Sequence, residues 1–209
     1  MVSEEKEEID RFVNEAAKLR GHLCLGLPLG VKMGMQGLRL LHMEDKHSRD
    51  SLMVVVENNK CPADGIQVVT GCTAGSRRLK VYDYGKSAAV FYDGQSGIGY
   101  RVTTKSDFLA QAMKLAVSNG LIKEGQNVEE FSQLERKIMM NAFTKMTEDE
   151  LFDVHQVRVS GKIPLLPSLS HPKTTCSRCG EEIMDGKGVK TNGTVVCDSC
   201  HYGSYYVAL

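Results

Sequence analysis

The pattern of apolar and polar positions at the start of the chain has a helical period. Ser3 followed by Glu4 and Glu5 supplies an N-cap and an acidic first turn, and Gly21 interrupts the pattern. The sequence therefore predicts an amphipathic helix over roughly the first twenty residues. Its apolar face would carry Ile9, Phe12, Val13, Ala16 and Leu19.

A second helix is predicted from about Gly26 to Leu41. Three glycines, Gly30, Gly34 and Gly37, recur in it at helical spacing. Because a glycine in a helix interior costs roughly 1 kcal/mol relative to alanine, such a stripe indicates that another element packs very close to the helix. A frayed loop is the alternative interpretation.

The middle of the chain alternates short apolar runs with turn residues. LMVVVE, residues 52–57, predicts a buried strand, and Pro62 suits the first position of a helix that ends near Gly71. Strands on both sides of a turn near Gly85, and a third after Gly97, would form a meander. Because these strands are partly consecutive, the pattern favours an α+β fold over a regular α/β alternation. The remaining predicted elements are helices over 106–119 and 128–145, a capping box at 147–150 and a strand over 155–159.

Composition narrows the class of protein without giving a function. Of the 209 residues, 42% are hydrophobic and 25% are charged, which is typical of a globular chain. The 26 lysines and arginines equal the 26 aspartates and glutamates, so the net charge does not indicate nucleic-acid or membrane-surface binding. The polar, acidic N-terminus predicts no signal peptide, and no apolar run is long enough for a membrane span. We expect a cytoplasmic protein.

Four of the seven cysteines form two C-x-x-C pairs separated by 17 residues, a spacing typical of a four-cysteine zinc site. Asn192-Gly193 between the pairs predicts a hairpin. Knuckle, hairpin and a second knuckle that opens a helix is the order of a treble-clef finger, although a zinc ribbon has nearly the same pattern. So short a module depends on its metal for folding. The predicted zinc ligands are Cys176, Cys179, Cys197 and Cys200.

A proline-rich stretch precedes this finger. Residues 160–175 hold three of the five prolines, which suits an extended connector. The predicted organisation is a core domain over residues 1–160, a linker over 161–174 and a zinc finger over 175–209. With no secretion signal, the seven cysteines favour reduced thiols or metal ligands over a disulfide framework.

The remaining cysteines lie beside glycines in the core domain. In GHLCLG, residues 21–26, His22 and Cys24 precede the second predicted helix, while Cys61 and Cys72 flank the next one. Taken singly, each thiol is more often a buried reduced cysteine than a ligand. A straight helix would also separate Cys61 from Cys72 by roughly 15 Å, which is too far for one metal ion unless the helix is shorter or bent.

Three stretches of the core are more specific than any single thiol: GHLCLGLPLGVKM, CPADGIQVVTGCTAGSRRL and DYGKSAAVFY. Together, over residues 8–160, they resemble FmdE, a family of formylmethanofuran dehydrogenase subunits. The resemblance implies a thioredoxin-like α+β core, with a mixed sheet flanked by helices and a metal-binding active site. It also implies archaeal or bacterial anaerobic metabolism, where some members are associated with the molybdenum or tungsten enzyme that reduces carbon dioxide to formylmethanofuran.

Carried over residue by residue, the family motif places His22, Cys61 and Cys72 at a core metal site, with Cys24 as a fourth ligand or a nearby thiol. One histidine and two or three cysteines suit zinc, so we expect one zinc here and one in the finger. An open coordination position would let the metal activate water or polarise a carbonyl. The polar groups around the metal would be Asp64, Gln67, Thr70 and Thr73.

The chain departs from the family pattern at Arg20 and Leu25 in the first motif and at Ser76-Arg77 in the second, which leaves substrate and partner open. Two functions are therefore predicted. One is a zinc-dependent catalytic or accessory subunit related to formylmethanofuran dehydrogenase. The other is a non-catalytic zinc adaptor whose finger docks a partner protein or nucleic acid; the few basic residues make nucleic acid the weaker partner. The apolar helices would also accommodate a homodimer.

Overall fold

A computed structural model describes residues 2–118, 120, 122–159 and 173–207. The chain divides into two compact units, Met1–Leu166 and Pro167–Leu209, and each has its own apolar cluster. Most of the predicted linker, residues 161–174, lies outside the described residues, so the linker stays a prediction. Among the described helices, none combines the length and the apolar composition that a membrane span requires.

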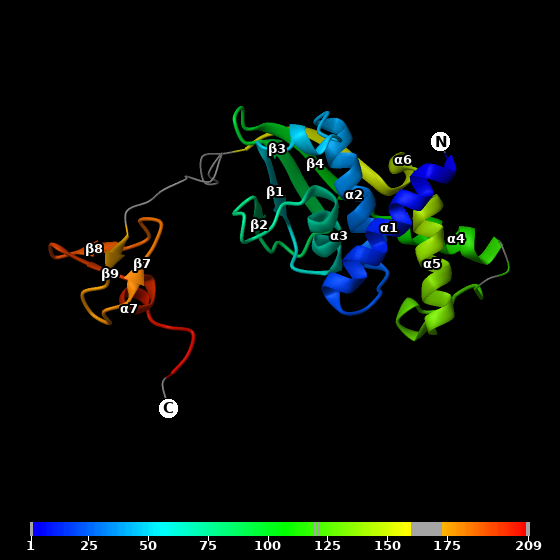
Figure 1. Cartoon of the computed structure of the whole chain (residues 1–209). Coiled ribbons are helices and arrows are strands. Elements are labelled where there is room, and N and C mark those ends of the chain that lie inside the picture. Colours follow the sequence, from blue (N-terminus) through cyan, green and yellow to red (C-terminus); the bar gives the residue numbers. More distant parts are fainter. Residues whose placement is uncertain (1, 119, 121, 160–172, 208–209) are drawn as a thin grey trace. The chain divides into compact units, whose positions relative to one another are not determined.

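A five-stranded mixed sheet forms the centre of the first unit (Figure 1). Its strands stand in the order β2-β1-β3-β4-β5, with β1 parallel to β2 and all other neighbours antiparallel. The predicted meander is wrong at its first turn, because β2 pairs with β1 and not with β3. The chain after β2 instead bonds to the end of β1, where the N–H groups of Tyr84 and Lys86 donate to the Glu57 carbonyl. The strands are β1 Leu52–Val56, β2 Leu79–Val81, β3 Ala88–Asp93, β4 Ile98–Thr104 and β5 Phe152–Arg158.

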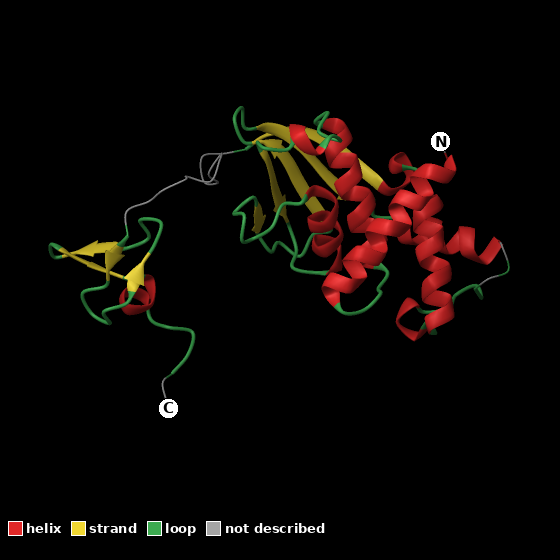
Figure 2. Cartoon of the chain, viewed as in Figure 1, coloured by secondary structure: helices red, strands yellow, loops and turns green. Residues whose placement is uncertain are grey.

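Helices pack on one face of this sheet (Figure 2). Leu52, Val54 and Phe91 point into the main core, each with no exposed surface. The helices are α1 Val2–Arg20, α2 Gly26–Leu40, α3 Cys61–Thr70, α4 Phe108–Ser118, α5 Gln133–Lys145 and α6 Glu148–Leu151. The predicted capping box at Thr147 is confirmed, since its hydroxyl and the Glu150 carboxylate cap each other's backbone N–H. An α+β fold with a mixed sheet and flanking helices is therefore confirmed, while its thioredoxin-like character stays a prediction.

The glycines of α2 let it lie directly against α3. A methyl group added at Gly30 would stand 2.1 Å from the Pro62 carbonyl oxygen, and one at Gly65 would stand 2.7 Å from the Leu27 carbonyl oxygen. Backbone therefore meets backbone at two levels of the helix pair, with no room for a side chain. The predicted close approach to α2 is confirmed, and α3 is the element that makes it.

The opposite face of the sheet carries a smaller apolar cluster and an ion pair. Met53, Val55 and Tyr92 are buried there. Beside them the Arg101 guanidinium donates from Nε and from one terminal nitrogen to the two carboxylate oxygens of Glu57, at 2.7 and 2.8 Å. Hydrogen bonding to Arg101 lowers the pKa of Glu57 below its ordinary value of 4.5.

This ion pair predicts a pH-dependent stability. Because the folded state lowers the pKa of Glu57, the pair stabilises the fold fully above about pH 5, and the contribution is lost as the pH falls through the folded pKa. We expect Glu57→Gln to lower the free energy of unfolding by about 1–3 kcal/mol at pH 7. The gap to wild type should close in acid. Urea unfolding across pH 3–8 checks this, with the exposed Glu7→Gln as control; a gap independent of pH would contradict it.

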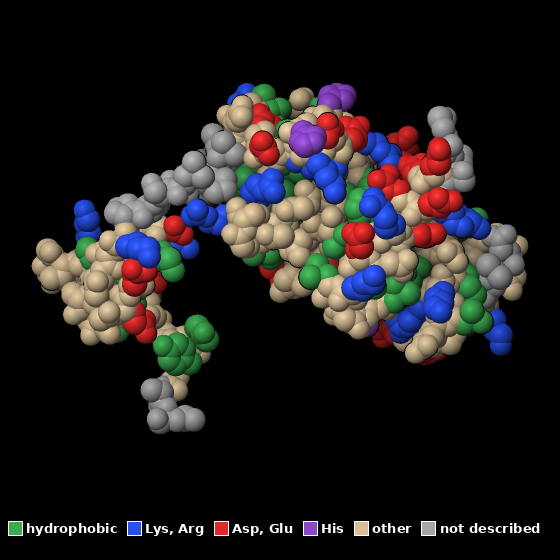
Figure 3. All heavy atoms as spheres, viewed as in Figure 1, with side chains coloured by type: hydrophobic (Ala, Val, Ile, Leu, Met, Phe, Trp, Pro, Cys, Tyr) green, Lys and Arg blue, Asp and Glu red, His purple; other side chains and the backbone are tan. Residues whose placement is uncertain are grey.

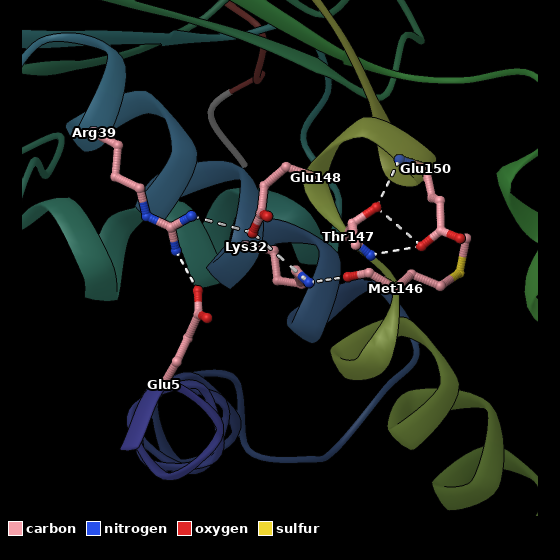
Figure 4. Close-up of polar contacts among 7 residues, drawn as sticks. All are labelled: Glu5, Lys32, Arg39, Met146, Thr147, Glu148 and Glu150. Carbon is pink, nitrogen blue, oxygen red and sulfur yellow. Dashed lines mark hydrogen bonds and ion pairs between the residues drawn. The ribbon is translucent and has the colours of Figure 1, made fainter. Parts of the chain in front are cut away.

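A buried lysine joins α2 to the junction of α5 and α6 (Figure 4). The Lys32 ammonium donates to the Met146 carbonyl, which ends α5, and lies 3.8 Å from a carboxylate oxygen of Glu148. Burial lowers the pKa of Lys32 from 10.5, although the Glu148 charge opposes that shift. Arg39 extends the network, since its guanidinium lies 2.6 Å from Glu5 on α1 and 3.4 Å from Glu148. One side chain of α2 thus caps a helix that lies more than a hundred residues further along the chain.

Removing this cap should destabilise the core. We expect Lys32→Met to lower the free energy of unfolding by about 1–3 kcal/mol, because methionine keeps most of the aliphatic volume but leaves the Met146 carbonyl without a donor. Lys6→Met is the matched control, since Lys6 is exposed at the rim of the same cavity and should change stability by less than about 0.5 kcal/mol. Equal losses from both changes in urea unfolding would contradict the assignment.

The second unit is a small finger of short strands and one short helix. Asn192 and Gly193 both have positive φ, 49° and 79°, and they join β8 to β9 as the predicted hairpin. The helix opens directly after Cys197. Its elements are β6 Thr174–Thr175, β7 Glu182–Ile183, β8 Val189–Thr191, β9 Thr194–Val196 and α7 Asp198–Tyr202. The predicted order of knuckle, hairpin, knuckle and helix is confirmed.

Candidate metal centres

The finger brings its four cysteine sulfurs together. The Sγ atoms of Cys176, Cys179, Cys197 and Cys200 all lie within 4.8 Å of one another. Cys176 is buried against Ile183 and Val196, which makes the cluster the centre of the unit's small apolar core. Four thiolates at this separation fit one tetrahedral zinc ion.

Hydrogen bonds already favour charge on part of this cluster. Backbone N–H groups of Cys179 and Cys197 lower the pKa of Cys176 from 9.0 to about 6. Hydrogen bonds from Cys197, together with burial, raise the pKa of Cys200 to about 12. The thiols thus hold their protons against one another, and a dication in their centre would replace those protons.

In the core domain, two of the candidate thiols meet where α2 and α3 begin. Cys24 stands two residues before α2, and Cys61 is the first residue of α3. A side-chain hydrogen bond links the two thiols, and the backbone N–H groups of Gly26 and Leu27 bond to the Cys24 sulfur. Burial, followed by the neighbouring Cys61 thiol, raises the pKa of Cys24 to about 11. Both thiols are half-buried, so solvent reaches them.

A polar rim surrounds the Cys24–Cys61 pair. The Arg20 guanidinium donates to Asp64 Oδ2 at 2.8 Å and to His22 Nε2 at 3.3 Å. Hydrogen bonding to Asp64, and then the charge of Cys61, raises the pKa of Arg20. His22 is exposed on the turn beside Cys24. Arg20, which the sequence presented only as a departure from the family, therefore ties His22 and Asp64 together at this site.

Cys72 lies at the other end of α3. It is fully buried, and its Sγ donates to the Leu52 carbonyl at 3.6 Å. Burial raises its pKa, while the nearby Arg78 charge opposes that shift. Since α3 runs unbroken from Cys61 to Thr70, its length of about 15 Å separates the two cysteines. The structure brings Cys24 and Cys61 together but does not bring Cys72 to them.

The predicted polar groups divide in the same way. Asp64 lies beside the Cys24–Cys61 pair through Arg20. Gln67 is one turn further along α3. At the far end, the Thr70 hydroxyl accepts from the Cys72 N–H, and Thr73 exchanges hydrogen bonds with Ser76.

The donor set of the core was tested for its fit to zinc. Among the residues that the structure describes, the finger alone gathers three or more ligand atoms within 4.8 Å. In the core, Cys24 and Cys61 supply two sulfurs in contact, and His22 supplies an imidazole on an exposed turn next to them. Sulfur and imidazole are ligands that zinc prefers, so this donor set fits once the exposed His22 side chain turns inward.

A groove separate from both centres lies between α1 and the C-terminal end of α3. Two adjoining cavities of about 490 and 500 Å³ share Glu8, Phe12, Glu44, Arg49 and Val69 in their walls. The Arg49 guanidinium is engaged, because it donates to the carbonyls of Met43, Glu44 and Val69. The groove therefore presents carboxylates beside an aromatic ring, while this guanidinium is already occupied.

Comparison with known proteins agrees with both units. Residues 19–153 match the family FmdE, described as "FmdE, Molybdenum formylmethanofuran dehydrogenase operon", and residues 170–206 match the prokaryotic dksA/traR C4-type zinc finger. The core match includes the Cys24–Cys61 pair, and the finger match includes all four clustered cysteines.

Two individual proteins extend the comparison. A "Probable S-adenosyl-L-methionine-binding protein" of Archaeoglobus fulgidus is 28% identical over 214 residues, covering 98% of this chain but 56% of its own length. This chain thus spans little more than half of that relative. An FmdE-like protein of tungsten formylmethanofuran dehydrogenase type, from Syntrophus aciditrophicus, has a similar fold, with a TM-score of 0.68, 20% identity and 95% coverage of both chains. Since the family match spans well over half of the sequence, the chain belongs to the FmdE family and carries a C-terminal dksA/traR C4-type zinc finger.

Proposed function

We propose that the protein is a zinc-dependent catalytic or accessory subunit of FmdE type, whose second zinc ion is held in the core by Cys24 and Cys61 with His22. The observation that supports this proposal is the contact between two solvent-reachable thiols at the neighbouring starts of α2 and α3. Backbone N–H groups at these helix starts carry partial positive charge, which favours thiolates. Cys72, although part of the family motif, would then act as a buried core residue.

A zinc ion held by three protein ligands would supply a Lewis acid with one open position. The chain's own groups would complete the site. Arg20 orients His22 and Asp64 by hydrogen bonds, and its charge, facing both thiols, would favour an anionic group of a substrate. Asp64 would accept a proton only after separating from Arg20.

Cobalt(II) in place of zinc tests whether the core position is open. In the Cys179→Ser variant, only the core ion would remain, and its absorption should shift when cyanide is added. In the Cys61→Ser variant, only the finger ion would remain, and its spectrum should not change. A core spectrum that ignores cyanide would mean a closed, structural ion, and the adaptor function would then replace the catalytic one.

The partner of such a protein is also a proposal. Membership of the FmdE family, and the printed name of the Syntrophus protein, support association with a molybdenum or tungsten formylmethanofuran dehydrogenase. Acidic and basic side chains are interspersed on the face seen in Figure 3, which suits a protein partner or a second copy better than nucleic acid. Copurification of a tagged full chain from its native host, with and without the finger cysteine Cys179, tests for that complex.

A second candidate function is binding of S-adenosyl-L-methionine, and the groove beside α1 favours it. The sulfonium and ammonium groups of this ligand are cations, and the groove presents Glu8 and Glu44 beside the Phe12 ring. S-adenosyl-L-homocysteine lacks the sulfonium charge and is the matched control. Binding by calorimetry to the first ligand, weakened by Glu8→Gln and at least tenfold weaker for the second, would support this function. No heat with either ligand would exclude it.

A further inference from the structure

Cys24 and Cys61 form a candidate dithiol, a property that does not depend on a metal ion. Their side chains share a hydrogen bond, and both are half-buried. They come from segments 37 residues apart in the sequence. Cys72, by contrast, is fully buried with its thiol directed at the Leu52 carbonyl. A dissolved reagent can therefore reach the first two thiols but not the third.

The backbone holds the two segments close to each other. A methyl group added at Gly26 would stand 2.8 Å from Cys61 Cβ, which leaves no space between the start of α2 and the start of α3. The glycine contacts further along the helices fix this approach. Cysteines can be bridged only when their backbones lie this near, so little movement is required to join Cys24 to Cys61.

We propose that Cys24 and Cys61 form a thiol–disulfide exchange centre that is oxidised by low-molecular-weight disulfides. The inference concerns the thiols of the proposed zinc site and needs them free of metal. A disulfide there would consume both sulfur ligands, so oxidation and metal binding at this site exclude each other.

The chemistry proceeds in two balanced exchanges. The Cys61 thiolate attacks one sulfur of a disulfide RSSR, forming a mixed disulfide and releasing one RS⁻. Cys61 is the first attacker because it interacts more strongly with the Arg20 charge than Cys24 does. The Cys24 thiolate then attacks the Cys61 sulfur and releases the second RS⁻. In sum, the dithiol loses two electrons to RSSR, and its two protons end on two RSH molecules.

Peptide mapping of the full chain tests this exchange. The reduced, chelator-treated protein is equilibrated with glutathione disulfide, alkylated with N-ethylmaleimide and cut with trypsin. Peptide 21–32, which holds Cys24, should be linked to peptide 61–77. Because peptide 61–77 holds both Cys61 and Cys72, the same link must also form in the Cys72→Ser variant. The Cys24→Ser variant should stop at a glutathione adduct on Cys61.

Several outcomes would overturn the proposal. They are the alkylation of Cys24 and Cys61 in full, an adduct on wild type as lasting as that on Cys24→Ser, and a link that vanishes in Cys72→Ser. Zinc per chain, measured on the same preparation before chelation, separates this proposal from the metal site. A core zinc without the link would leave the metal proposal standing, and the link without a core zinc would do the reverse.

Discussion

Replacing Cys179 with serine is expected to remove zinc from the finger and to unfold that unit while the core domain stays folded. The four sulfurs lie within 4.8 Å of one another at the centre of an apolar cluster that has only Cys176, Ile183 and Val196 fully buried. So small a core cannot hold the unit without the ion, since zinc binding supplies about 10–16 kcal/mol to fingers of this kind. Loss of one ligand should therefore cost the whole finger fold.

Two measurements check this expectation. Elemental analysis should show about one zinc fewer per chain than wild type, and amide NMR signals of residues 173–207 should collapse to the unfolded range. Ser177→Ala, an exposed change between two ligands, is the matched control and should keep both the zinc and the signals. A finger that keeps dispersed signals after Cys179→Ser would show that its fold does not depend on the metal.

Gly30→Ala is expected to lower the free energy of unfolding of the core by about 3 kcal/mol or more, near the upper end of single-residue effects. The added methyl group would meet the carbonyl oxygen of Pro62 at 2.1 Å and its carbonyl carbon at 2.7 Å, and neither backbone atom can rotate away. The two helices would have to separate at the end where Cys24 meets Cys61. Loss of stability and loss of the core metal should therefore come together.

Gly34→Ala is the control on the same helix. Its added methyl group would lie 3.0 Å from the Val69 side chain, which needs to move by only a few tenths of an ångström. Alanine is also favoured over glycine in a helix by about 1 kcal/mol, so the net change should be small. Thermal and urea unfolding of both variants decide the point. Equal effects at the two positions would mean that the α2–α3 contact is looser than the structure shows.

The predictions from sequence succeeded where the local pattern determines the structure. The glycine stripe at Gly30, Gly34 and Gly37 correctly indicated a close neighbour, and Thr147 correctly indicated a capping box. The turn near Gly85 was misassigned, because a strand–turn–strand pattern does not say whether another strand will insert between the two. Here β1 takes that place through a parallel pairing with β2, and parallel pairing leaves no mark in a short strand.

The metal centres show the same division. In the finger, the spacing of two C-x-x-C pairs alone determines that the sulfurs meet. In the core, the motif grouped four ligands together, but α3 holds Cys61 and Cys72 at opposite ends. The distance of roughly 15 Å across that helix could be anticipated from its length. The pairing of Cys24 with Cys61 could not, because it depends on how closely α2 packs against α3.

Zinc content tests the core metal site most directly. It should be measured per chain on the full-length protein purified without chelator, and on its Cys24→Ser, Cys61→Ser and Cys72→Ser variants. We expect about two zinc ions in wild type and in Cys72→Ser, and about one in each of the other two variants. One zinc in wild type, or a loss in Cys72→Ser equal to that in Cys61→Ser, would contradict a core site built on Cys24 and Cys61.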